Sequence, residues 1–108
     1  MATVNYSSDI DTTAGTAVIA WNPLNVGPDD DGQAFDARGW HLASVQIAIV
    51  SSPYSGTFSF QASNDGTNWA DIAAGTIFNP STFRAVYFRP KVNGTSGQIS
   101  CIAYFESK

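Results

Sequence analysis

A chain of 108 residues has room for one domain around one hydrophobic core. The net charge of −4 and the pI of 4.4 argue against nucleic acid as a partner, because its binders need clustered lysine and arginine. An acidic surface also suits anionic membranes poorly, and no apolar run approaches the roughly eighteen residues of a membrane span. We expect neither a nucleic-acid nor a membrane partner.

The composition favours strands over helices. Fifteen valines and isoleucines and fourteen aromatic residues suit a pleated sheet, whereas helix-favouring residues are scarce, with two leucines, two lysines and one glutamate. Charged residues make up 13% of the chain, about half of the roughly 25% usual in soluble domains. These numbers predict an all-β domain whose surface is polar but mostly uncharged.

The N-terminal part of the chain is polar. Residues 1–14 are rich in Ser, Thr and Asp without a regular period, so we expect an arm that a partner orders. Residues 15–108 are expected to form a single β-sandwich domain, with its first strand at residues 17–21. Residues 22–36, which include three consecutive aspartates, predict a long surface loop of the kind that is often functional.

Two strands with alternating apolar residues follow, at residues 39–51 and 57–63. The sharpest turn signal comes next, where an Asx side chain can cap its own backbone and a glycine tolerates positive φ. A tryptophan then opens the returning strand. The predicted structural turn therefore consists of Asn64, Asp65, Gly66 and Trp69.

The last predicted hairpin joins residues 84–89 to residues 98–106 through a loop rich in Pro, Asn and Gly. In its second strand Cys101 faces the core, while Ile102 and Tyr104 fall on the opposite face. Because an isolated sandwich prefers polar groups there, Ile102 and Tyr104 are candidates for a subunit interface. Short alternating strands at regular spacing predict an antiparallel, jelly-roll-like β-sandwich.

The sequence contains no clear catalytic constellation. His41 lies inside an apolar strand and Cys101 alternates with core residues, so both are interpreted as structural. The chain is therefore expected not to be an enzyme, with no catalytic residue and no cofactor. Asp29, Asp30 and Asp31 precede a glycine as in a calcium-binding loop, but the first and last ligand positions hold glycine and arginine. A solvated acidic loop without a metal is preferred, and whether these aspartates bind a cation stays open.

Three tryptophans raise an alternative function. Trp21, Trp40 and Trp69 are candidates for stacking on sugar rings, as aromatic residues do in many sandwich modules. The opposing interpretation is that each packs in the core. A carbohydrate-binding module, lectin-like or discoidin-like, is thus the alternative to a structural protein.

Residues 58–69, FSFQASNDGTNW, combine a strand, a tight turn and a returning tryptophan. This segment resembles the S-N-D-G-x-x-W hairpin of small bacteriophage structural β-sandwich proteins and, more distantly, of discoidin-like sandwiches. Residues 83–90, FRAVYFRP, are similar to the strand that follows in both groups.

The phage resemblance implies a virion structural protein, either a capsid decoration (cement) protein or another head or tail accessory protein. It implies synthesis in the host cytoplasm and a location in the virion, with which the single cysteine and the lack of a signal-peptide pattern in residues 1–10 agree. The partner would be the capsid or tail lattice, contacted through the N-terminal arm and the long loop. By analogy with decoration proteins on symmetry axes, we expect a homo-oligomer, specifically a trimer.

Overall fold

The computed structural model describes residues 2–73, 77–83 and 85–107, without the side chains of residues 73–83. Over this part of the chain there are strands and turns but no helix, and hence no helix able to cross a membrane. The strands are β1 (Thr3–Val4), β2 (Tyr6–Asp11), β3 (Thr16–Asn25), β4 (Asp31–Gly32), β5 (Phe35–Asp36), β6 (Trp40–Ser63), β7 (Ala70–Ala73), β8 (Ile77–Phe83) and β9 (Tyr87–Ser107). The all-β prediction is confirmed.

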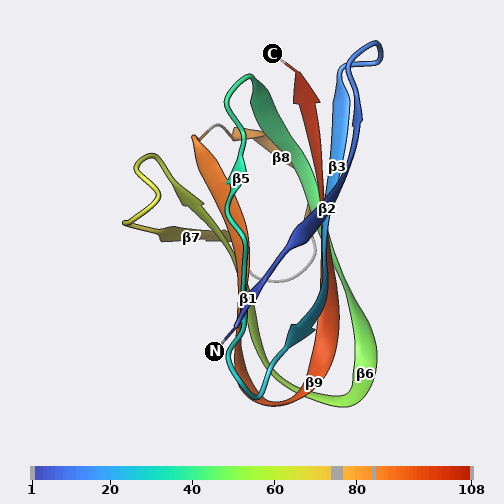
Figure 1. Ribbon diagram of the computed structural model, residues 1–108, viewed down its shortest axis with the longest axis vertical. Coiled ribbons are helices and arrows are strands. Elements are labelled where there is room, and N and C mark those ends of the chain that lie inside the picture. Colours follow the sequence, from blue (N-terminus) through green and yellow to red (C-terminus); the bar gives the residue numbers. More distant parts are fainter. Residues whose placement is uncertain (1, 74–76, 84, 108) are drawn as a thin grey trace.

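The long strands β6 and β9 form one antiparallel ribbon that frames the fold. Its pairing runs from Trp40 opposite Ser107 to Ser63 opposite Tyr87. Figure 1 shows the ribbon bending back at its lower end, so that its two halves lie in two facing layers. One bent ribbon therefore supplies the centre of both layers of the predicted β-sandwich.

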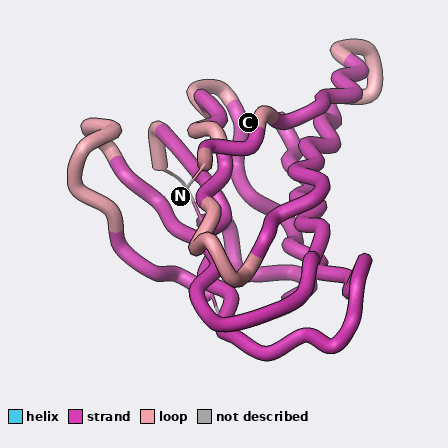
Figure 2. Tube along the Cα trace, turned by 60° about the horizontal axis from the view of Figure 1, so that its bottom comes forward, coloured by secondary structure: helices cyan, strands magenta, loops and turns pink. Residues whose placement is uncertain are grey.

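Shorter strands complete each layer. The β3 layer contains β2, β3, residues 98–107 of β9, residues 40–51 of β6, and β8. The β7 layer contains β4 and β5, residues 87–94 of β9, residues 56–63 of β6, and β7, with β1 beside β4. Figure 2 shows strand along most of the trace, with short loops between strands.

Gly56 and Gly94 permit the bend of the ribbon. A Cβ atom on Gly56 would lie 2.5 Å from the backbone oxygen of Asn93 and 2.5 Å from Cγ1 of Val26. A Cβ atom on Gly94 would lie 2.4 Å from Cα of Gly56. Because Cβ atoms do not approach other atoms so closely, the two backbones can pass each other here only as glycines.

The structure corrects two predicted breaks in these strands. The sequence predicts separate strands at residues 39–51 and 57–63, whereas the structure joins them in β6. It also predicts a loop from Pro90 onward, whereas Phe60 pairs with Pro90 and β9 continues without interruption. Proline and glycine usually end strands, but here both strands bend together through small irregularities of register and keep their pairing. Arg84, where the predicted hairpin begins, lies outside the described residues.

The core lies between the two layers. It consists of Ala17, Ile19, Trp21, Leu24, Val26, Phe35, Ala37, Leu42, Val45, Phe58, Phe60, Ala62, Phe88, Val92, Ile99, Cys101, Ala103 and Phe105. The ring of Phe88, from the β7 layer, packs against that of Phe105, from the β3 layer, with 5.4 Å between centroids, and thereby joins the two halves of the core. Each such buried ring contributes about 1.5–3 kcal/mol to stability. The alternation predicted for residues 99–105 is the one found.

The polar N-terminal segment is part of the sandwich rather than a loose arm. Strand β2 pairs with β3 from Tyr6 opposite Trp21 to Asp11 opposite Thr16. Tyr6 packs edge-on against Trp21, with 6.1 Å between ring centroids. An apolar period is missing because β2 is an edge strand, most of whose side chains are exposed. The expectation of an arm that only a partner orders is thereby corrected.

The predicted surface loop at residues 22–36 is also packed onto the sandwich. Val26 and Phe35 belong to the core, and β4 and β5 pair with β9. The glycines, prolines and aspartates of this segment predict a loop and give no sign of the short strands. These strands pair with β9, which lies far away in the sequence, so no local pattern reports them.

Candidate functional site

The turn after β6 is held by its own side chains. The Asp65 carboxylate accepts hydrogen bonds from the backbone N–H groups of Thr67 and Asn68, each at 2.8 Å, and from the Ser63 hydroxyl. These donors, led by the backbone N–H of Asn68, lower the pKa of Asp65 far below its usual range. Gly66 has a φ of +76°, which glycine adopts without strain. The turn is therefore a rigid Asx cap around an ionised carboxylate.

Trp69 follows the turn and lies beneath an arginine of β9. The guanidinium carbon of Arg89 is 4.2 Å from the ring centroid, a cation–π contact. Arg89 also donates from Nε to Oε1 of Gln61 at 2.9 Å and pairs with Asp31 at 3.4 Å. Gln61 donates in turn to Asp71 at 2.9 Å. This polar ladder, made of Asp71, Gln61, Arg89 and Asp31, crosses the outer face of the β7 layer and covers one face of Trp69.

A pocket of about 290 Å³ opens beside the turn. Its lining residues are Ala62, Ser63, Asn64, Asn68, Ala70, Ile72 and Ala85. The register opposes Ala62 to Ala70, so the small side chains of β6 and β7 leave room on one side of the hairpin. The lining combines an apolar floor with polar groups from the turn, and none of its described residues is charged.

Two amides at the pocket are fixed by the turn yet keep hydrogen-bonding capacity. Asn64 accepts a bond at its Oδ1 from the backbone N–H of Val86 at 3.3 Å. Asn68 donates from its Nδ2 to the Asp65 carboxylate at 2.8 Å. Among the bonds of the described residues, the Asn64 NH₂ group and the Asn68 Oδ1 remain as one donor and one acceptor. The predicted turn therefore positions polar groups at a pocket. The pocket itself was not predicted from the sequence.

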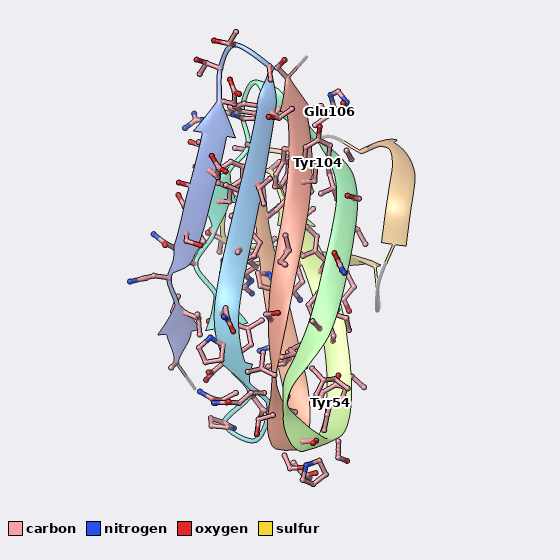
Figure 3. All side chains as sticks on the ribbon, turned by 90° about the vertical axis from the view of Figure 1, so that its right-hand side faces the viewer. Tyr54, Tyr104 and Glu106 are labelled. Atoms are coloured by element: carbon pink, nitrogen blue, oxygen red, sulfur yellow. The ribbon has the colours of Figure 1, made fainter. Side chains whose placement is uncertain are left out.

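The candidate interface residues Ile102 and Tyr104 lie on the outer face of the β3 layer, where Figure 3 shows Tyr104 on β9. Ile102 is 37% exposed and Tyr104 is half-buried. Their neighbours on β3 are also apolar, since Val18 pairs with Tyr104 and Ala20 pairs with Ile102. The sequence singles out two residues of this patch, and the alternation of residues 16–22 is the signal that would have added the other two.

The aspartate run is structural rather than a solvated loop. Asp30 is 1% exposed and accepts hydrogen bonds from the backbone N–H groups of Ala2 at 3.1 Å and Asn25 at 3.0 Å. Asp29 accepts one from the backbone N–H of Gly94, and Asp31 forms the ion pair already described. The three carboxylates diverge to different partners, and no cluster of metal-ligating side chains occurs among the described residues.

The residues considered for catalysis or stacking are placed in structural positions. Cys101 and Trp21 are fully buried, and burial raises the pKa of the Cys101 thiol. The indole N–H of Trp21 donates to the backbone oxygen of Gln33 at 2.9 Å. Trp40 packs against the core. Nε2 of His41 lies 3.9 Å from Glu106, with no described serine hydroxyl bonded to the imidazole.

Sequence reasoning missed the pocket and the arginine over Trp69. The pocket brings together Ala62, Ala70 and Ala85, three small residues from separate segments that carry no local signal. The contact between Arg89 and Trp69 depends on the pairing of β9 with β6, which is established over a long sequence distance.

The fold is that of a small β-sandwich, as the pairing of its strands shows. No family model and no curated protein matches the chain. One similar solved structure is "CpGH89CBM32-6 produced by Clostridium perfringens", with 14% identity, 94% of this chain and 92% of that chain covered, and a TM-score of 0.41. Another is CBM32-3 from a family 31 glycoside hydrolase of Clostridium perfringens, with 15% identity, 86% and 66% covered, and a TM-score of 0.36. Both are carbohydrate-binding modules, but similarity at this level indicates nothing about the ligand of this chain.

Proposed function

We propose that the chain is a non-catalytic binding domain that binds a single sugar ring in the pocket beside the Asp65–Gly66 turn. The observation that supports this function is the pocket itself, of about 290 Å³, with an apolar floor and two fixed amides. Ligand pockets range from about 300 to 1,000 Å³, so this one suits a small ligand.

The chemistry of the lining favours a sugar over other small ligands. The C–H groups of a pyranose ring pack on Ile72 and the alanine side chains, while its hydroxyls both donate and accept hydrogen bonds. The NH₂ group of Asn64 and the Oδ1 of Asn68 match that pair of roles. Among the described residues, no charged side chain lines the pocket, which favours a neutral ligand over a phosphate or a carboxylate.

The same lining supports binding without turnover. General acid–base catalysis needs a titratable group within hydrogen-bonding reach of the reacting bond. The Asp65 carboxylate, which is bonded to the lining residues Ser63 and Asn68, is committed to four donors of the turn and has a strongly lowered pKa. It is therefore a positioning group for Asn68 rather than an acid.

The proposal is tested by titrating the protein with neutral monosaccharides and following backbone amide shifts by NMR. We expect saturable shifts at residues around the turn, with a Kd on the order of 1 mM, or about −4 kcal/mol, as befits so small a contact. Ala70→Leu fills the pocket and should abolish the shifts. Ala34→Leu adds the same side chain at an exposed position outside the lining and should leave them unchanged. Equal binding by both variants, or no shift with any neutral sugar, would refute sugar binding in this pocket.

A second candidate, a bacteriophage virion structural protein, is favoured by a different observation. The outer face of the β3 layer carries Ile102 and Tyr104 on a surface poor in charge, and burial of unpaired charges is what dense lattices penalise. On this proposal the chain would be found in purified particles, in contact with the capsid or tail lattice. Absence from such particles by mass spectrometry would reject the virion role, whatever the outcome of the sugar titration.

A further inference from the structure

The two outer faces of the sandwich differ in chemistry. The β7 layer carries the polar ladder, in which Arg89 pairs with Asp31 and Gln61 links Arg89 to Asp71. The β3 layer presents a patch of Val18, Ala20, Ile102 and Tyr104 in the middle of its outer face. Val18 and Ile102 are each 37% exposed. A contiguous apolar patch of this kind, rimmed by polar residues, marks a contact surface.

The patch has a self-complementary order. The patch consists of two cross-strand pairs, Val18 with Tyr104 and Ala20 with Ile102, which lie at two successive levels along the strands. At each level β3 carries the smaller side chain and β9 the larger. A two-fold axis parallel to the strands, placed between β3 and β9, sets β3 of one copy against β9 of the other. Small side chains then face large ones at both levels, as in the interleaved core of two sheets packed about 10 Å apart. We propose that two copies of this chain pack face to face through this patch.

The charges around the patch are compatible with this arrangement. In the register of the sheet, Asp11 lies at the level of His41, and Asp9 lies at the level of Ser44 on the far side of the face. The two-fold axis brings β2 of one copy over β6 of the other. Asp11 then faces His41 and Asp9 faces Ser44, so these acidic side chains meet an imidazole and a hydroxyl rather than each other. The third acidic group of the face, Glu106, faces the uncharged Thr16.

The size of the face sets the expected strength. Four strands at about 4.8 Å spacing and seven residues at about 3.4 Å give a face of roughly 19 by 24 Å, or roughly 450 Å². A stable interface buries about 800 Å² on each partner. The dimer is therefore weak and reversible, with a Kd on the order of 10–100 µM.

Dimerisation through the β3 layer leaves the pocket accessible, because the pocket is lined by β6, β7 and their neighbours in the other layer. A dimer would present two such pockets, and linked sites bind a multivalent surface more tightly than single sites do. The dimer does not depend on sugar binding, since the two surfaces share no residue.

Sedimentation equilibrium over about 5 µM to 1 mM tests the proposal, a range that brackets the expected Kd. The intact chain should shift from monomer to dimer, and NMR shifts on dilution should concentrate on outward residues of β3 and β9. Ile102→Ser removes an apolar contact that the two-fold axis repeats, and should weaken the dimer by at least about tenfold. Ile10→Ser is the matched control, because Ile10 is 47% exposed but pairs with Ala17, on the opposite side of the sheet from the patch.

Three results would overturn the proposal. They are a monomer throughout the concentration range, an Ile102→Ser variant that dimerises like the intact chain, and a limiting mass of three copies. The last would support the trimer expected from the phage resemblance instead. Circular dichroism and thermal unfolding of each variant separate loss of association from loss of folding. The pocket provides an independent readout, because Ile102→Ser should bind monosaccharide per site as the intact chain does.

Discussion

Gly56→Ala tests the idea that the bend of the β6–β9 ribbon requires glycine. The added Cβ atom would lie 2.5 Å from the backbone oxygen of Asn93 and 2.5 Å from Cγ1 of Val26. Val26 has some freedom to turn away, but the Asn93 oxygen belongs to the paired ribbon, so the backbone itself has to move. Overpacking that displaces backbone costs about 1–3 kcal/mol and occasionally more, and we expect about 3 kcal/mol here. At roughly 4–8 °C per kcal/mol for a domain of this size, Tm should fall by about 12–24 °C.

Two controls separate the close contact from other effects of glycine replacement. Gly39 has a φ of +90° with nothing within 4 Å of its ideal Cβ position, so Gly39→Ala should cost only the backbone term of about 1–2 kcal/mol. Adding Val26→Ala to Gly56→Ala should not restore stability, because the contact with the Asn93 oxygen persists. Urea unfolding at constant m-value measures all three variants. A Gly56→Ala change below about 0.5 kcal/mol, within the range of ordinary surface substitutions, would refute the steric account of the bend.

Three further predictions concern the turn and the last strand. Gly66→Val should cost about 1–3 kcal/mol, because a β-branched residue is strained at the φ of +76° found there, and an unchanged Tm would contradict this. Cys101 is fully buried, and burial raises its pKa, so thiol reagents should label it only on unfolding; rapid labelling of the native protein would contradict its core position. The pKa of Asp65 is lowered in the folded state, so the ionised carboxylate stabilises the fold fully above the unfolded pKa of about 3.9. This stabilisation is lost progressively as the pH falls from that value toward the folded pKa. Asp65→Asn should therefore be less stable than wild type at neutral pH, with a gap that closes below about pH 4; a gap independent of pH in urea unfolding would contradict this.

Local features of the fold could be predicted from the sequence. The alternation around Cys101 gives the correct faces of β9, and the Asp65–Gly66 pair marks a turn whose geometry is determined within five residues. Both depend on interactions between near neighbours. Sequence patterns report such interactions directly.

Features that depend on distant pairing could not be predicted. The bend at Gly56 and Gly94 resembles two independent turns in the sequence, because only the pairing of the two strands makes it one shared bend. Strand β2 has no apolar period since, apart from the packing of Tyr6 on Trp21, its attachment to β3 comes from backbone pairing. Asp30 appears solvated until its backbone donors, Ala2 and Asn25, are brought to it by the fold.

The same limit applies to the candidate site. Asn64 belongs to the turn that the sequence predicts, whereas Asn68 is not among the predicted turn residues. The pocket that both border also needs Ala85, which comes from a later segment of the chain. Ile102 and Tyr104 could be assigned to an outer face from alternation alone. Their grouping with Val18 and Ala20 required the register of β3 against β9.

The edge of the β3 layer favours face-to-face contact over edge-to-edge contact. Strand β2 is an edge strand, and exposed edges invite pairing with further chains in open-ended assemblies. Asp9 and Asp11 lie on this edge, and a second β2 brought alongside it would oppose acidic side chains without any cation, since β2 has none. The apolar patch on the face carries no such charge. The proposed dimer therefore uses the face rather than the β2 edge, and a single two-fold axis closes it.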